Sequence, residues 1–495
     1  MMDALMQAPT VSVAVLNHRR PALLLRVLTA IAQLDYPTFE IVVVGDQPDI
    51  ASYGLPGDLA GHVKYVHFTE PNICRARNLA VQVAGGEIIA FIDDDAAPEP
   101  SWLTELVRPF SDPKIATVGG TVRASDGITL EWQGGVFDRT GLEKDLNLAQ
   151  DITTRTANEQ HAAGTYLALR GVNSAFRRKA VVEVGGFDEA IRYYLDETDM
   201  ALRLAEAGWS AAIAGRAEVH HLLVPNATRG LLRKPGNQYE IGASKALFCA
   251  KHIPEQSEDA LSEFRTHRIA MLDPQMRLGI VRTKDRDRIE RELEQGILEG
   301  RSRLSCHPLE VASPAPAFLA LERSGTQRSL NIGIDTGWNP STNTALVGFS
   351  RALSAAGHRV SVFSFKSGPK ALRVNYRDGV WRHSGGTWTL PATGEIRAIA
   401  RHDRADAERS RIHHVRKMDL TLTARHASKA NGFIELPGCR QKVTILAHDM
   451  NEADAAEATA LLQSVADGQQ ATQNHFESSI AASKTTPVSK PVSAT

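Results

Sequence analysis

Short apolar runs alternate with helical patterns through the first hundred residues of the chain. Four of these runs have the composition of strands in a buried sheet: residues 11–16, 40–44, 63–68 and 88–92. Leucine and isoleucine recur at helical spacing after Pro21, and a second helical pattern spans residues 72–84. This β-α-β order predicts an α/β fold with a doubly wound sheet, in which ligands bind at the carboxyl ends of the strands.

Polar residues stand where the predicted strands end. They are Asn17 and His18 after the first strand, Asp46 after the second, and Asp93, Asp94 and Asp95 after the fourth. Adjacent carboxylates repel one another, so three at one strand end cost stability unless a cation or a hydrogen-bonded ligand offsets the repulsion. Hard cations such as Mg²⁺ bind one or two carboxylates together with substrate phosphates. The three aspartates therefore predict a divalent-metal site for a phosphorylated ligand. The alternative is a solvated acidic turn that caps a helix starting near Ser101.

A second group of acids lies further along the chain, at the start of a helical pattern that ends at Gly208. Asp196, Glu197 and Asp199 fall in its first turn, where acids complement the helix dipole. A strand over residues 211–214 and a separate run ending in His220 and His221 follow. The polar segment 126–161, which precedes this helix, is expected to be an irregular insertion.

Length and composition predict several domains, because 495 residues exceed one ordinary core. We expect residues 1–230 to form the α/β domain and residues 231–327 a helical extension and linker. A strand-helix-strand pattern at residues 330–363 predicts a partial Rossmann-like unit over 328–462. Residues 463–495 are rich in Ala, Ser, Thr, Pro and Gln and are expected to be a disordered tail.

The charge balance argues against a nucleic-acid partner, since 56 Lys and Arg face 57 Asp and Glu for a net charge of -1. The four cysteines have no paired spacing, so neither a disulfide framework nor a zinc site is expected. We find no signal-peptide pattern and no apolar run of membrane-spanning length. These features predict a cytoplasmic protein, with peripheral contact to the inner face of the membrane left open.

A set of motifs in residues 11–230 resembles the inverting family 2 glycosyltransferases of GT-A fold. The motifs are Val44-Gly45-Asp46, Arg77-Asn78, Phe91 to Asp95, Asn173 to Arg178, Gly185 to Glu189, and Asp196 to Met200. Each is weak alone, but their order and separation make the set specific. The resemblance covers a little under half of the chain.

The resemblance implies a nucleotide-sugar donor, a carbohydrate or lipid-linked acceptor, and a divalent cation, Mg²⁺ or Mn²⁺. By position it assigns nucleotide-sugar binding to Asn17, His18, Asp46, Arg77, Asp93 and Asp94. It makes Asp95 the direct metal ligand and His221 a candidate second one, whose alternative is a polar strand end. It makes Glu197 the first candidate for the catalytic base and Asp196 the second. The alternative for Arg77 is an exposed helix arginine.

Two departures from the family pattern leave the nucleotide base open. Asn17 and His18 stand where the family usually has Thr-Tyr, and Gly45 replaces a common aspartate. Residues 330–363 separately resemble the opening of a family 4 glycosyltransferase of GT-B fold, but too little chain follows for both halves of such an enzyme.

The resulting hypothesis is an inverting glycosyltransferase of cell-surface polysaccharide synthesis. A sugar nucleotidyltransferase is one alternative, although the loop at residues 17–20 lacks the glycines that such an enzyme uses after its first strand. A catalytically silent nucleotide-sugar-binding or scaffold protein is the other.

Overall fold

The computed structural model describes residues 8–47, 59–146, 155–156, 164–230, 234–305, 309, 316–321, 331–335, 344–355, 357–369, 371–389, 400–401, 433–435 and 442–446. The chain divides into two compact units between Gln327 and Arg328. Each unit is described by itself below.

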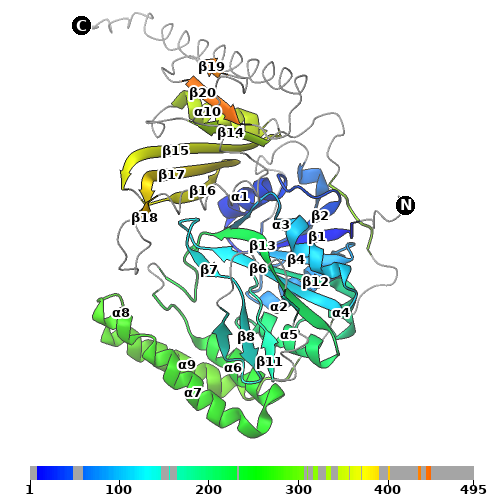
Figure 1. Cartoon of the computed structure of the whole chain (residues 1–495). Coiled ribbons are helices and arrows are strands. Elements are labelled where there is room, and N and C mark those ends of the chain that lie inside the picture. The colour runs from blue at the N-terminus through cyan, green and yellow to red at the C-terminus, as the bar shows by residue number, and fades with distance from the viewer. Residues whose placement is uncertain are drawn as a thin grey trace, which may run out of the picture. The chain divides into compact units, whose positions relative to one another are not determined.

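Parallel strands form one half of the sheet in the first unit (Figure 1). They are β1 (Val11–Asn17), β2 (Phe39–Gly45), β3 (Val63–His67) and β4 (Ile88–Asp93), in the order β3-β2-β1-β4. Helix α1 (Pro21–Ile31) connects β1 to β2, and α2 (Ile73–Val83) connects β3 back to β4. The strand order therefore reverses between β1 and β4, which is where open α/β sheets bind ligands.

Strands of mixed direction form the other half of this sheet. They are β12 (Asn173–Arg177), β6 (Ile115–Arg123), β13 (Ser210–His221), the short β5 (Ala96–Pro98), β7 (Leu130–Trp132) and β10 (Arg155–Thr156). Strand β12 pairs antiparallel with β4, and β5 pairs antiparallel with the end of β13, so that Ala96 lies opposite His221. This pairing brings the chain after the three aspartates beside the two histidines.

Two sequence predictions about this half are wrong. Residues 211–214 and 219–221 belong to one strand, because β13 continues through an irregularity between Ala214 and Glu218. The segment 126–161 is not irregular where the structure describes it. It contributes β7 and β10 to the main sheet and, with β11 (Thr165–Leu167), forms a separate sheet through β8 (Gly135–Asp138) and β9 (Glu143–Asp145).

Short helices flank the sheet beyond α2. They are α3 (Trp102–Val107), α4 (Arg178–Glu183) and α5 (Asp196–Glu206), with 3-10 turns at Leu59–His62 and Arg108–Ser111. Phe91, Phe176 and Phe187 meet edge to face in the core, with ring centroids 5.7–6.0 Å apart. They tie β4, β12 and the loop before α5 together.

A helical extension follows, made of α6 (Tyr239–His252), α7 (Ser257–Ala270), α8 (Asp273–Arg277) and α9 (Thr283–Gly300), with a 3-10 turn at Pro254–Gln256. Figure 1 shows α7 and α9 side by side, with α8 at one end of the pair. A small apolar core that includes Ala246, Leu261 and Leu293 holds α6, α7 and α9 together. No helix in the described ranges has the length and hydropathy needed to cross a membrane.

The segment 316–321, within the stretch expected to be a linker, is hydrogen-bonded to the first unit. The carboxylate of Glu40, fully buried, accepts the backbone N–H of Leu319 at 2.7 Å and pairs with Lys64 at 2.8 Å. The backbone N–H of Leu321 donates to the carbonyl of Phe39 at 2.8 Å. This part of the chain is therefore fixed to the first unit at strand β2.

The second unit opens as β14 (Asn331–Asp335), α10 (Thr344–Ala355) and β15 (Arg359–Pro369), the strand-helix-strand order that its sequence predicts. Its other strands are β16 (Arg373–Arg377), β17 (Val380–Thr389), β18 (Ala400–Arg401), β19 (Phe433–Glu435) and β20 (Lys442–Leu446). Strands β14, β15 and β17 are parallel, whereas β20 is antiparallel to β14. The sequence also has a strand-like pattern at residues 419–423, which lie outside the described residues.

Candidate active site

The end of β1 meets the end of β4 through side chains. Asn17, 4% exposed, donates from Nδ2 to Asp94 at 2.7 Å, and the guanidinium of Arg20 pairs with the other Asp94 oxygen at 3.0 Å. Burial and, more weakly, the neighbouring charges of Asp95 and Asp93 raise the pKa of Asp94 to about 6, against the opposing charge of Arg20. A residue of β1 thus holds Asp94 by a hydrogen bond at the point where the strand order reverses.

Asp46 lies at the end of β2 and holds the same loop. It accepts the backbone N–H of Arg19 at 2.9 Å and the side-chain amide of Gln47 at 2.7 Å, with the ring of half-exposed His18 3.5 Å away. Burial opposes ionisation, but these hydrogen bonds and the nearby imidazole outweigh it and lower the pKa of Asp46. Asp46 is therefore an ionised acceptor beside His18.

Asp93, Asp95 and His221 form a compact group in which one ligand atom from each lies within 4.8 Å of the others. The Nε2 atom of His221 is 3.2 Å from Asp95, whose second oxygen accepts the backbone N–H of Val224 at 2.9 Å. Burial and then the charge of Asp95 raise the pKa of Asp93. Two carboxylates and an imidazole suit a divalent cation, so these residues fit a metal site.

Glu131, on β7, holds the other side of the His221 ring. Its carboxylate lies 3.1 Å from Nδ1. Burial works against a charged ring, but hydrogen bonds to Asp95 and Glu131 raise the pKa of His221 to about 9. A carboxylate on the far nitrogen is the arrangement that orients metal-ligating histidines in proteins.

The acids at the start of α5 pair with Arg77 from α2. The guanidinium of Arg77 is 3.1 Å from Asp196 and 3.3 Å from Glu197. Arg77 is only 1% exposed and stacks over the rings of Phe91 and Phe187, 4.8 and 5.4 Å from their centroids. The alternative for Arg77, an exposed helix arginine, is wrong, because this cation is enclosed by aromatic rings and acids.

The two acids differ in exposure and in proton affinity. Asp196 is buried, while the side chain of Glu197 is 18% exposed. Burial and then the charge of Glu197 raise the pKa of Asp196 well above its usual range, although Arg77 opposes the shift. Asp196 therefore keeps a proton to higher pH than an exposed aspartate does, and it shares a hydrogen bond with Glu197.

Gly171 leaves the space that this pair occupies. A Cβ atom built on Gly171 would lie 2.1 Å from Glu197 Oε1 and 2.2 Å from Arg77 Nη2. Arg77 is enclosed, so the partly exposed Glu197 would have to move aside and would lose its contact with Arg77. The absence of a side chain at this position is thus a requirement of the Arg77–Glu197 contact.

Asp93 interacts electrostatically with both acidic groups. Its pKa is affected by the charges of Asp95 and His221 and by those of Arg77 and Glu197. The metal-type group at the end of β4 and the acid pair at the start of α5 are therefore near enough for their charges to interact.

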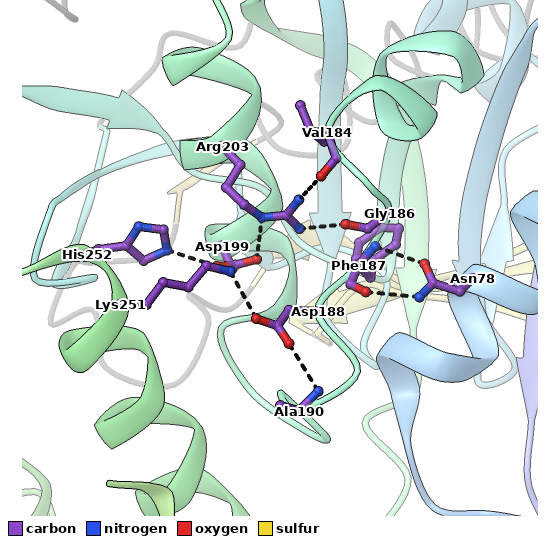
Figure 2. Close-up of polar contacts among 10 residues, drawn as sticks. All are labelled: Asn78, Val184, Gly186, Phe187, Asp188, Ala190, Asp199, Arg203, Lys251 and His252. Carbon is purple, nitrogen blue, oxygen red and sulfur yellow. Dashed lines mark hydrogen bonds and ion pairs between the residues drawn. The ribbon is translucent and has the colours of Figure 1, made fainter. Parts of the chain in front are cut away.

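A network of ion pairs and hydrogen bonds around Asp199 joins α5 to α6, as Figure 2 shows. Asp199, 1% exposed, contacts Arg203 at 2.8 Å, Lys251 at 2.7 Å and His252 at 2.8 Å. Burial opposes ionisation, but the charge of Arg203, the hydrogen bond from His252 and the charge of Lys251 outweigh it and push the pKa of Asp199 far below its usual range. Lys251 also pairs with Asp188 at 2.9 Å. Asp199 thus has the structural role at the helix start that its position in the first turn predicts.

Asn78, next to Arg77, holds the loop before α5. It accepts the backbone N–H of Phe187 at 2.8 Å and donates to the carbonyl of the same residue at 2.9 Å (Figure 2). Gly185 and Gly186 precede this ring with φ of +79°, a conformation that favours glycine. The two contacts seat Phe187 against Arg77.

Backbone strain concentrates around the site. In the ranges that the structure describes, the non-glycine residues with positive φ are Arg19, Tyr194, Leu195, Leu223 and Asp378. Arg19 precedes α1, Tyr194 and Leu195 directly precede Asp196, and Leu223 lies two residues after His221. Each such residue costs about 1 kcal/mol or more, and such strain clusters where function needs it.

His220 belongs to a different group from His221. Its Nε2 lies 2.8 Å from the buried Glu99. Glu218 beside it is held in a two-pronged ion pair by Arg123, at 2.6 and 3.0 Å. Arg123 balances the charge of Glu218, and His220 contacts Glu99, so each of these side chains has a partner within the protein.

The structure thus gathers the predicted residues into four contacts: Asn17 with Asp94, His18 with Asp46, Asp93 with Asp95 and His221, and Arg77 with Asp196 and Glu197. Sequence analysis missed Glu131 and Gly171. Glu131 lies in the segment expected to be irregular, and no local pattern marks it. Gly171 lies just before the motif Asn173 to Arg178, where a single glycine carries little signal.

The model of Glycosyl transferase family 2 matches residues 12–185, a little over a third of the chain. The match includes the ends of β1, β2 and β4, whereas Glu197 and His221 lie after it. Together with the strand order, it confirms the predicted α/β fold class of GT-A type for the first unit.

Curated relatives match parts of the same region. The O-antigen biosynthesis protein RfbC of Myxococcus xanthus is 26% identical over 222 residues, which are 43% of this chain and 17% of that protein. The succinoglycan biosynthesis protein ExoM of Rhizobium meliloti is 30% identical over 125 residues, 24% of this chain and 40% of that protein. The chain therefore spans less than half the length of these relatives.

Among solved structures, that of GalNAc-T7 with UDP, GalNAc and Mn²⁺ aligns with 49% of this chain and 48% of its own, at 16% identity and a TM-score of 0.39. At this score the similarity adds nothing to the family match.

Proposed function

We propose that the first unit transfers a sugar, with inversion, from a nucleotide-sugar donor to a carbohydrate or lipid-linked acceptor in cell-surface polysaccharide synthesis. The family match over residues 12–185 supports glycosyl transfer. The names of the relatives, O-antigen and succinoglycan biosynthesis proteins, support a polysaccharide product.

The observation that carries this proposal is the convergence of two acidic groups with different chemistry. Asp93, Asp95 and His221 offer ligands for a cation, and Glu197 with Asp196 offers a base. Transfer with inversion needs both, because a diphosphate leaves on one side of the anomeric carbon while a hydroxyl attacks from the other. The interaction of Asp93 with Glu197 supports a single centre for the two tasks.

In the proposed reaction Glu197 removes the proton of the acceptor hydroxyl. The acceptor oxygen bonds to the anomeric carbon as the bond from that carbon to the diphosphate oxygen breaks, and the nucleoside diphosphate leaves with the electron pair. Asp196, with its raised pKa, supplies a hydrogen bond to Glu197. Arg77, which the resemblance assigned to nucleotide-sugar binding, is enclosed and holds both acids, so it is a positioning residue in this account.

The residues at the ends of β1 and β2 are proposed to bind the nucleotide. Asp46, ionised and hydrogen-bonded, would accept an N–H of the base with His18 beside it. Asn17 and Asp94, already joined across the β1–β4 reversal, would face the ribose.

Asp95 and His221 are proposed as the protein ligands of a divalent cation, Mg²⁺ or Mn²⁺, with Asp93 adjoining them. When bound, the cation supplies a Lewis acid for the charge that grows on the diphosphate. Glu131 then accepts a hydrogen bond from the Nδ1–H of His221, so that Nε2 faces the ligand site.

A screen of nucleotide sugars for hydrolysis in the presence of Mn²⁺ tests the proposal. We expect at least one donor to be cleaved slowly by the wild-type protein and far more slowly by Glu197→Gln. Cleavage of none of them, with either Mn²⁺ or Mg²⁺, would contradict it.

The second unit is proposed to be a non-catalytic partner for acceptor binding or assembly, and its likeness to a family 4 enzyme stays a prediction. A cytoplasmic setting at the inner face of the membrane is likewise part of the proposal, since a lipid-linked acceptor is presented there.

A further inference from the structure

The far end of the helical extension projects large apolar side chains into solvent. Met271, between α7 and α8, is 52% exposed, and Leu278, directly after α8, is 75% exposed. Gly279 follows Leu278 with φ of +68°, which permits the turn that leaves the leucine at the surface. We call residues 271–284 the tip.

This exposure belongs to a folded tip. Leu272 and Val281, within the same stretch, are each only 2% exposed. The backbone N–H of Leu278 donates to the carbonyl of Pro274 at 3.2 Å, and that of Ile280 to Gln275 at 2.9 Å. The tip therefore buries one set of apolar residues and presents Met271 and Leu278 outward.

Three exposed cations lie in the same stretch of chain as the two exposed apolar residues. Arg277, Arg282 and Lys284 are exposed, and their side chains form no ion pair with any residue in the described ranges. Asp273, the single acid among residues 271–284, pairs with Arg286 at 3.5 Å. The tip thus combines protruding apolar groups with unbalanced positive charge, although the chain as a whole has a net charge of -1.

We propose that the tip docks on an anionic lipid surface. Basic side chains on one side of an apolar protrusion are the features that hold peripheral segments in the headgroup region. Met271 and Leu278 enter the boundary between headgroups and acyl chains, while Arg277, Arg282 and Lys284 contact lipid phosphates. Each cation near such a surface contributes roughly fivefold in affinity at low salt. The surface is independent of the proposed sugar transfer and is tested without any nucleotide sugar.

Co-sedimentation of the full chain with vesicles provides the test. We expect binding to phosphatidylcholine vesicles that contain phosphatidylglycerol, weakening with added salt, and little binding to phosphatidylcholine alone. Arg277→Gln with Lys284→Gln should lower affinity roughly twentyfold or more. Met271→Ser with Leu278→Ser should lower it as well, without changing the salt dependence.

Matched controls lie elsewhere on the same unit. Leu298→Ser replaces a leucine that is 68% exposed on α9, about 20 Å along the helix from Lys284, and Lys114→Gln replaces an exposed lysine on the main domain. Both should leave vesicle binding unchanged, and circular dichroism verifies folding of every variant. Absence of wild-type binding to anionic vesicles, or equal losses in tip and control variants, would overturn the proposal.

Discussion

Glu197 and Asp196 are neighbours in the chain but occupy different surroundings, and a pair of substitutions separates their roles. Glu197→Gln should lower turnover roughly a hundredfold or more and leave donor affinity unchanged, because it removes the base and keeps its shape. Asp196→Asn should lower turnover less, since burial already raises the pKa of this acid and favours its protonated form. Steady-state rates and donor titrations on both variants check this. Near-normal turnover in Glu197→Gln would remove it as the base.

The single missing side chain at Gly171 provides a second test at the scale of a residue. Gly171→Ala places a carbon where Glu197 and Arg77 now meet, so we expect turnover to fall at least tenfold while nucleoside diphosphate affinity holds. Gly61→Ala is the matched control, because a Cβ there meets nothing within 4 Å. If Gly171→Ala retained wild-type turnover, the Arg77–Glu197 contact would not position the base.

At the scale of elements, Asp199 links α5 to α6 and makes stability depend on pH. Its folded-state pKa lies far below the usual value of about 3.9, so its contribution is present above that pH and is lost as pH falls toward the folded pKa. Asp199→Asn should therefore reduce the free energy of unfolding by about 3 kcal/mol at neutral pH, since Arg203 and Lys251 lose the buried carboxylate that they share. The difference from wild type should shrink below about pH 4.

Urea unfolding at several pH values measures this difference. Asp287→Asn, at an exposed position on α9, is the control and should change stability little at any pH. A difference for Asp199→Asn that stayed constant from neutral to acidic pH would contradict the assignment of the network.

Elements set by local pattern were the ones that sequence analysis could predict. Helix α2 begins after Asn72 because that side chain accepts the N–H of Arg75, a local cap that the sequence displays. The aspartates at the end of β4 were equally visible as a polarity change. The burial of Arg77 was not, because it depends on Phe187, more than a hundred residues away in the chain. Glu131 could not be predicted for the same reason, because its partner His221 lies on another strand, distant in the chain.

At the scale of the whole molecule, the segment 316–321 ties the stretch between the two units to the first. A chain ending at Gln327 should fold by itself, because the first unit has its own core. A chain ending after residue 314 loses the hydrogen bonds of Leu319 to Glu40 and of Leu321 to Phe39. We expect it to be less stable by at least about 1.5 kcal/mol, because a buried carboxylate loses a donor. Equal thermal stability of the two chains would show that the segment does not contribute.

The central claim is that Asp95 and His221 hold a cation that binds a nucleoside diphosphate in the first unit. Calorimetric titration of the full chain with UDP, GDP, ADP, CDP and dTDP, with Mn²⁺ or with EDTA, tests it most directly. The account predicts that at least one nucleotide binds, that Mn²⁺ tightens it, and that Asp95→Asn weakens the Mn²⁺-dependent affinity at least about tenfold in a folded protein. Wild-type protein that binds none of them in a Mn²⁺-dependent way would contradict it.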